Sequence, residues 1–169
     1  MGQRAYVAVV LEDNSAVYLF THWSGELLPR WVQTALKTEG LDRGNHLAAA
    51  IARQMDLSRI DTKMIFGIPD SGTIVVNCKT QRVGFAQEKG VAFFKEELDQ
   101  YLALAEPGIP KPVRERFVVA ADMPIYKDWS FEEYRQLDWS TIDAQYERAV
   151  NLTEAIGEAL IEKNLAARK

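Results

Sequence analysis

Two runs of strand-favouring apolar residues near the start of the chain predict a β-hairpin. Residues 4–12 and 16–23 are rich in valine, leucine and aromatic residues, which favour strands. Asp13-Asn14-Ser15 between them favours a tight turn. Because side chains alternate along a strand, one face of the second strand should carry Tyr18, Phe20 and His22. His22 therefore ends a row of aromatic side chains.

The hydrophobic period changes after the hairpin and predicts two amphipathic helices. Apolar residues recur at helical spacing over residues 26–38 and again over 45–57. Pro29 falls in the first turn of the first helix, where a missing backbone N–H costs little. In the second helix, the residues expected to face inward are Leu47, Ala48, Ile51 and Met55.

Three further strands are predicted over residues 63–68, 73–78 and 82–87, separated by turn-forming residues. A helix over 91–105 and a short edge strand over 117–121 follow, on either side of a proline-rich stretch. The pattern therefore predicts an α+β fold. It has a mostly antiparallel sheet of about five strands, with helices packed on it.

Serine residues mark the last two predicted helices. Ser130 and Glu133 have the spacing of a capping box, which predicts a helix over 131–137, and Ser140 offers a weaker cap for a long final helix. Trp23, Trp129 and Trp139 each precede a serine. An apolar residue at that position can staple a helix start onto the core, so we expect these tryptophans to be packed.

The final helix carries a heptad-like seam of residues spaced alternately by four and three: Ile142, Tyr146, Ala149, Thr153, Ile156 and Leu160. Two interpretations remain open. The helix lies across the core of the domain, or it projects and pairs with a second copy, making a homodimer through Ile142, Tyr146, Ala149, Ile156 and Leu160. We accordingly expect an α+β domain over residues 1–139 and a C-terminal helix over 140–169.

Composition supports an ordinary globular protein of one compact core. The 169 residues are 47% hydrophobic and 26% charged, and 20 basic against 24 acidic residues give no field that would attract nucleic acid. Cys78 is the single cysteine, so no intrachain disulfide can form, which fits a cytoplasmic location; we interpret it as a small buried hydrophobe. The apolar run 6–11 is too short for a membrane span.

Catalytic and cofactor-binding patterns are missing from the sequence. His22 and His46 belong to different predicted elements without metal-ligand spacing, and neither a G-x-S-x-G elbow nor a glycine-rich phosphate loop occurs. We therefore expect no metal, no cofactor and no enzymatic activity. The candidates for contact with a ligand or partner are His22, Trp23, Tyr18, Arg114, Arg116 and Trp129.

The segment from Arg4 to Gly25, followed by Leu28-Pro29 and the later Ser130–Glu133 stretch, resembles small uncharacterised proteins encoded by bacteriophages and their bacterial hosts. In that family the first hairpin ends in an aromatic-x-x-His-Trp/Ser-x-Gly corner, and a later S-F-E-E segment closes the domain. The family has no assigned activity. Together with the missing catalytic motifs, the resemblance implies a noncatalytic factor in host takeover or counter-defence, anti-CRISPR-like, that acts by protein contact.

An alternative function keeps the histidine corner as its centre. A small enzyme or a nucleotide-binding protein could use His22 together with carboxylates that the fold brings close. Against this stands a structural interpretation, in which His22 is a hydrogen-bonded histidine at the rim of the core. Specific binding of nucleic acid would depend on the short basic stretch 111–116 and is not expected.

Overall fold

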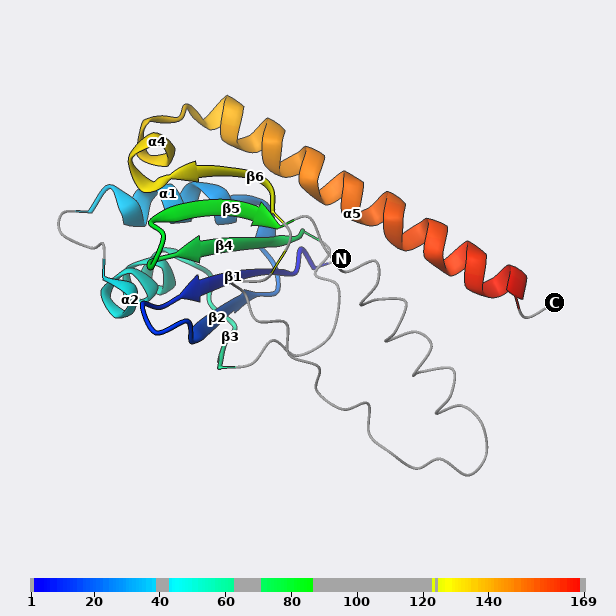
Figure 1. Ribbon diagram of the computed structural model, residues 1–169, viewed down its shortest axis with the longest axis horizontal. Helices are drawn as coiled ribbons and strands as arrows, with labels where there is room; N and C mark the ends of the chain where they lie inside the picture. Colours follow the sequence, from blue (N-terminus) through cyan, green and yellow to red (C-terminus); the bar gives the residue numbers. More distant parts are fainter. Residues whose placement is uncertain (1, 39–42, 63–70, 87–122, 124, 168–169) are drawn as a thin grey trace, which may run out of the picture.

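The computed structural model describes residues 2–38, 43–62, 71–86, 123 and 125–167 (Figure 1). Its strands are β1 (Ala5–Val10), β2 (Ala16–Thr21), β3 (Arg59–Asp61), β4 (Thr73–Asn77), β5 (Arg82–Ala86) and β6 (Ile125–Ser130). Its helices are η1 (Gly25–Leu27), α1 (Leu28–Leu36), α2 (Gly44–Gln54), α4 (Phe131–Gln136) and α5 (Trp139–Ala167). The α+β class predicted from the sequence is confirmed.

The strands form one mixed sheet in the order β3-β2-β1-β4-β5-β6. All neighbouring strands are antiparallel except the central pair, β1 and β4, which run parallel with Tyr6 opposite Thr73. Both central strands are valine-rich and almost fully buried, as expected for strands covered on both faces. The sheet is thus mostly antiparallel, as predicted, and its centre is a parallel pairing that the sequence pattern did not reveal.

Local signals located the two hairpins correctly. Asn14 takes a positive φ of 67° in the first turn, and the Asp13 carboxylate accepts the Ser15 amide at 2.9 Å. In the β4–β5 turn, Gln81 has a φ of 55° and the Asn77 side chain accepts the amides of Lys79 and Thr80. Asparagine and aspartate form such turns because their side chains bond nearby backbone amides.

Two edge strands, β3 and β6, were not predicted. β3 has three residues, too few for a periodic signal, and β6 places Lys127 and Asp128 within its six residues. Charged residues are common at sheet edges, where one side of the strand faces water. The strand predicted over 63–68, the helix over 91–105 and the strand over 117–121 lie outside the described residues.

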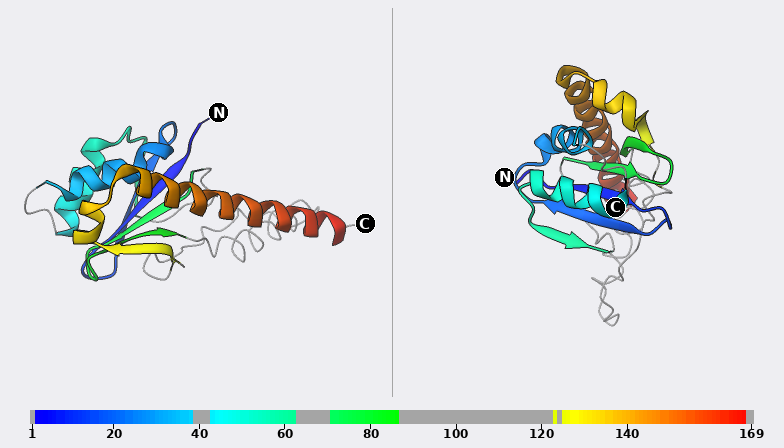
Figure 2. Two further views of the ribbon diagram at one scale, coloured as in Figure 1. Left: turned by 90° about the horizontal axis from the view of Figure 1, so that it is seen from above. Right: turned by 90° about the vertical axis from the view of Figure 1, so that its left-hand side faces the viewer.

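The helices cover one face of the sheet and build the larger core there (Figure 2). Alternate residues of the central strands, among them Val7, Val9, Ile74 and Val76, pack against the helices in this cluster. The inward residues predicted for the second helix, Leu47, Ala48, Ile51 and Met55, are buried as expected. A second cluster on the other face holds Tyr6, Tyr18 and Val75, with Phe20 packed beside it. Cys78 is buried within the larger core, as predicted.

The predicted capping box at the start of α4 is present in full. The Ser130 hydroxyl accepts the Glu133 amide at 3.1 Å, and the Glu133 carboxylate accepts the Ser130 amide at 2.8 Å. The hydrogen bond from the Ser130 backbone amide, and after it the Ser130 side chain, holds the pKa of the Glu133 carboxyl below its ordinary value. Trp129 precedes the cap and is buried, as the staple requires.

The lowered pKa makes α4 sensitive to acid in a defined direction. The ionised Glu133 stabilises the fold at pH values above its unfolded pKa, and this contribution is lost as pH falls through the lower pKa of the folded state. We expect Glu133→Gln to lose less stability than the wild type on acidification. Urea unfolding at neutral pH and at several pH values below 4.5 measures the difference.

A matched control is available in the same helical turn. Glu132→Gln removes a neighbouring carboxylate without touching the box, so its stability should fall with acid as steeply as that of the wild type. If the Glu132 and Glu133 variants showed equal acid slopes, the capping carboxylate would have no part in the pH dependence.

Two of the three predicted tryptophan staples are wrong. Trp23 is 61% exposed, and the Ser24 side chain makes no capping bond to η1. Trp139 is 52% exposed because α5 begins at that residue, so that Asp138, rather than Ser140, caps the helix by accepting the Thr141 amide at 2.9 Å. The apolar residue in front of a serine is packed only where the serine side chain makes the capping hydrogen bond, as at Ser130.

Helix α5 has 29 residues, and its first turns belong to the core of the domain. Ile142, Tyr146 and Ala149 are buried against the sheet, so these side chains are taken up within the chain and do not face a second copy. The helix then continues past the end of the sheet to its C-terminal end (Figures 1 and 2). The side chains of Ile156 and Leu160 lie outside the described part. Each helix that the structure describes is too short or too polar to span a membrane.

Candidate functional site

A groove of about 440 Å³ opens between the start of α1 and the first turns of α5. It combines charged groups, apolar walls and a neighbouring exposed aromatic side chain, that of Trp139. Its lining comprises Glu26, Leu27, Arg30, Ser71, Asp143, Tyr146, Glu147 and Val150.

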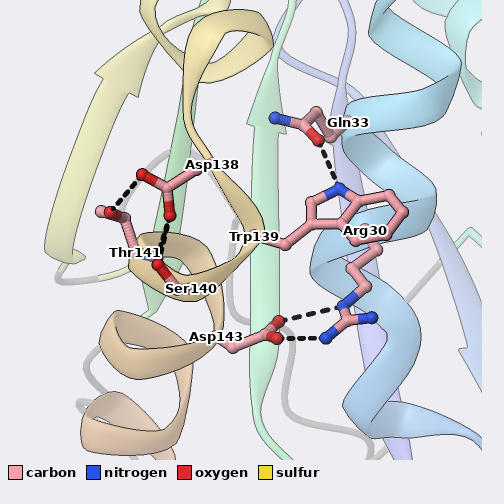
Figure 3. A network of polar contacts seen from close by, with 7 residues as sticks. All are labelled: Arg30, Gln33, Asp138, Trp139, Ser140, Thr141 and Asp143. Atoms are coloured by element: carbon pink, nitrogen blue, oxygen red, sulfur yellow. Dashed lines mark hydrogen bonds and ion pairs between the residues drawn. The ribbon is translucent and has the colours of Figure 1, made fainter.

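A buried glutamine fixes the two helices that form the groove. Gln33 on α1 donates from Nε2 to the carbonyl oxygens of Tyr134 at 3.0 Å and Leu137 at 2.6 Å. Its Oε1 accepts the indole N–H of Trp139 at 2.8 Å (Figure 3). Every polar atom of this amide side chain is therefore used to join α1 to α4 and to the start of α5.

One wall of the groove is an ion pair stacked on an indole ring. Arg30 on α1 donates from Nε and Nη2 to the two carboxylate oxygens of Asp143 on α5, a bidentate pair (Figure 3). The guanidinium also lies 4.9 Å from the ring centre of Trp139, in cation–π contact. The bond to Asp143 is the main reason that the pKa of Arg30 is raised, and the nearby Glu26 adds to the shift.

The base of the groove is held by a tyrosine and a glycine. The Tyr146 hydroxyl on α5 donates to the Ser71 carbonyl, next to the start of β4, and burial raises the pKa of this phenol. A Cβ on Gly25 would lie 2.7 Å from the Ser71 Cβ and 2.5 Å from the Gln3 carbonyl oxygen. Only glycine allows η1 to approach the Gln3 backbone and the Ser71 side chain so closely.

The lining has an excess of negative charge. It contains the three carboxylates of Glu26, Asp143 and Glu147 and the single guanidinium of Arg30. Asp143 and Arg30 neutralise each other, and the Glu26 carboxylate accepts the Gln3 amide at 2.9 Å. In the part of the chain that the structure describes, neither Glu26 nor Glu147 forms an ion pair.

The predicted histidine corner lies outside this lining. The His22 ring is partly exposed and stands 6.2 Å from the Phe20 ring and 4.4 Å from the Trp23 ring, and its backbone amide donates to the Ser58 hydroxyl at 3.2 Å. An ideal Cβ on Gly2 would lie 2.9 Å from the imidazole Nε2, so the chain start packs on the ring. The predicted aromatic row is therefore present.

A small polar cluster adjoins that row. Arg59 lies 4.8 Å from the ring centre of Phe20, donates to the Tyr6 hydroxyl and pairs with Asp61. Burial of Tyr6, partly offset by the Arg59 charge, raises the pKa of its phenol. The cluster joins the edge strand β3 to β1, and its charges neutralise each other.

The structure does not gather the other predicted contact residues into one site. Tyr18 is buried in the second cluster beneath the sheet. Trp129 is buried against Phe85 and Tyr134, which agrees with its stapling role and leaves its predicted contact with a partner without support. Arg114 and Arg116 lie outside the described residues.

Sequence reasoning missed the groove because its charged walls come from distant segments. Arg30 and Asp143 are 113 positions apart, and no local pattern links them. The sequence pattern singled out Trp139, but as a residue that packs the start of a helix onto the core. Within the described ranges, no three histidine, cysteine, aspartate or glutamate side chains are grouped so that they could hold a metal ion. The groove offers polar contacts and apolar area rather than an arrangement of nucleophile and base.

Comparison with known proteins adds no relative to this picture: no family model, no curated protein and no solved structure matches the chain.

Proposed function

We propose that the protein is a noncatalytic binding protein that contacts a protein partner through the groove between α1 and α5. The observation that carries the proposal is Trp139, which exposes about half of its side chain yet is fixed by the Gln33 hydrogen bond and by stacking on Arg30. A large aromatic side chain held in place in water loses little further entropy on binding. Tryptophan and arginine are accordingly the residues that most often dominate binding energy in protein interfaces.

The surroundings of Trp139 support the same proposal. Arg30 and Asp143 connect the indole to the groove, whose rim also exposes Leu27. An aromatic anchor next to an open hollow with apolar and charged walls is typical of an interface core with a polar rim. The resemblance to phage-encoded proteins suggests a host protein as the partner, and a host-takeover or counter-defence role remains a prediction.

The alternative, an enzyme or nucleotide-binding protein centred on His22, also remains a prediction. In the described ranges, the imidazole makes ring contacts with Phe20 and Trp23 and lies against the backbone of Gly2. None of these is a base, a nucleophile or a phosphate ligand, so we give the binding function precedence.

A quantitative capture experiment tests the proposed function. The wild type, the groove variant Leu27→Ser/Glu147→Lys and the surface control Ile60→Ser are immobilised and exposed to lysate of the cells that make the protein. Ile60 on β3 is an exposed apolar residue, like Leu27, but it lies outside the groove lining. We expect the wild type and the control to retain the same partner. The groove variant should retain about tenfold less of it, because losing an apolar contact and reversing a charge together cost more than about 1.4 kcal/mol of binding free energy.

The captured partner is then purified, and its affinity is measured directly for all three proteins. Equal affinity for the wild type and the groove variant would exclude the groove as the contact surface. If the wild type retained no partner, or none that bound after purification, the proposed binding function would be wrong. Equal melting temperatures for the three proteins ensure that loss of binding is not loss of folding.

A further inference from the structure

The charges in the groove indicate what a partner inserts there. Arg30 and Asp143 form a closed bidentate pair, so their charges cancel within the chain. The carboxylates that remain, Glu26 and Glu147, are exposed, and in the described part of the chain no lysine or arginine pairs with them. The groove therefore presents a net charge close to −2 that its own residues leave unbalanced.

The shape and the apolar walls restrict the cation that fits. About 440 Å³ is far more space than a bare metal ion fills, and the carboxylates stand beside the apolar side chains of Leu27 and Val150. Lysine and arginine match such a surface, because their methylene stems pack on apolar walls while the charged head reaches a carboxylate. The stacking of Arg30 on Trp139 with Asp143 shows the same recognition made within the chain.

We propose that the groove accepts the side chain of an arginine or lysine of the partner protein, with Glu26 and Glu147 as its counter-charges. This inference rests on the proposed function and specifies the chemistry of the partner. A basic side chain would approach from the open side, lay its stem against Leu27 and Val150 and place its charge between the two glutamates. Arg30 remains paired with Asp143 and forms the opposite wall.

N-Acetyl-argininamide and N-acetyl-citrullinamide are suitable probes, because the two differ in charge and hardly in shape. Each is titrated into the isotopically labelled full-length protein at matched ionic strength, and the backbone amide signals of Glu26, Leu27 and Glu147 are followed by NMR. We expect argininamide to shift these signals saturably and citrullinamide to leave them almost unchanged. N-Acetyl-lysinamide should act like argininamide, and added salt should weaken both.

Variants that remove the two charges provide a second test of the inference. Glu26→Gln/Glu147→Gln keeps the size of both side chains and should weaken argininamide binding about tenfold, since two partly exposed ion pairs are lost. The control Glu132→Gln removes one carboxylate on α4, outside the groove lining, and should bind like the wild type. Equal responses to argininamide and citrullinamide, no response to either, or full binding by the double variant would each overturn the inference.

The outcome separates this inference from the function on which it rests. If argininamide does not bind while the affinity of a captured partner still depends on Leu27 and Glu147, the groove binds protein by other contacts. In that case only the assignment of a basic side chain to the groove is wrong. If argininamide binds but no partner depends on the groove, the site accepts cations without serving as the protein interface.

Discussion

Replacing Phe85 by alanine is expected to lower the free energy of unfolding by about 3–5 kcal/mol, the usual cost of removing a buried aromatic ring. Phe85 is fully buried on β5. Its ring centre lies 5.0 Å from that of Trp129, 5.1 Å from that of Tyr146 and 6.3 Å from that of Tyr134. Because these rings come from β6, α5 and α4, a cavity at Phe85 weakens the attachment of all three elements at once.

Urea denaturation measures this change directly. Phe85→Leu serves as the conservative partner and should cost less, because it leaves a smaller cavity. Ile60→Ala on the exposed side of β3 should change stability by about 0.5 kcal/mol or less. A loss below about 1 kcal/mol for Phe85→Ala would mean that the C-terminal elements are not joined to the sheet through this ring.

Gln33→Leu is expected to destabilise the protein by about 2–4 kcal/mol, although leucine is nearly the same size. Gln33 is 1% exposed and makes three hydrogen bonds, two to backbone carbonyls and one from the Trp139 indole. Leucine removes all three bonds and takes a partner from the buried Tyr134 carbonyl, the Leu137 carbonyl and the Trp139 indole N–H, a loss that costs more where these groups are shielded from water. The change should also free Trp139 to move, and so alter the groove.

Two measurements separate these effects. Urea unfolding gives the stability change, and the NMR signal of the Trp139 indole N–H should move as its hydrogen bond is lost. The control is Thr34→Ala, the next residue along α1, whose side chain is exposed. It should change the free energy of unfolding by about 0.5 kcal/mol or less and leave the Trp139 indole signal in place. An unchanged indole signal in Gln33→Leu would show that the glutamine does not hold Trp139.

The sequence predicted the elements whose signals are local. The hairpin of β1 and β2 follows from two runs of strand-favouring apolar residues around Asp13-Asn14-Ser15, and the start of α4 follows from Ser130 and Glu133. Each depends on residues only a few positions apart, so the pattern contains all the information required. The packed position of Trp129 could be predicted for the same reason, since its cap is its neighbour.

The same reasoning was wrong for Trp139 because the cap of α5 lies two residues before Ser140, and for Trp23 because Ser24 makes no side-chain capping bond. Asp138 competes with Ser140 for the start of α5, and its carboxylate is the group that accepts the Thr141 amide. That shift places Trp139 in the first turn of the helix, where its indole is directed to Gln33 and Arg30. A pattern of residue types does not decide between neighbouring caps.

The sequence by itself therefore determined the α+β class, the two hairpins, the amphipathic helices and the capping box, because short-range backbone preferences and hydrophobic periodicity fix them. Only the tertiary structure decided that β1 pairs in parallel with β4, that the first turns of α5 are buried in the core, and that Arg30 meets Asp143 beside Trp139. These contacts join segments far apart in the chain. They depend on which buried faces fit together, a property of the packed molecule that no window of sequence contains.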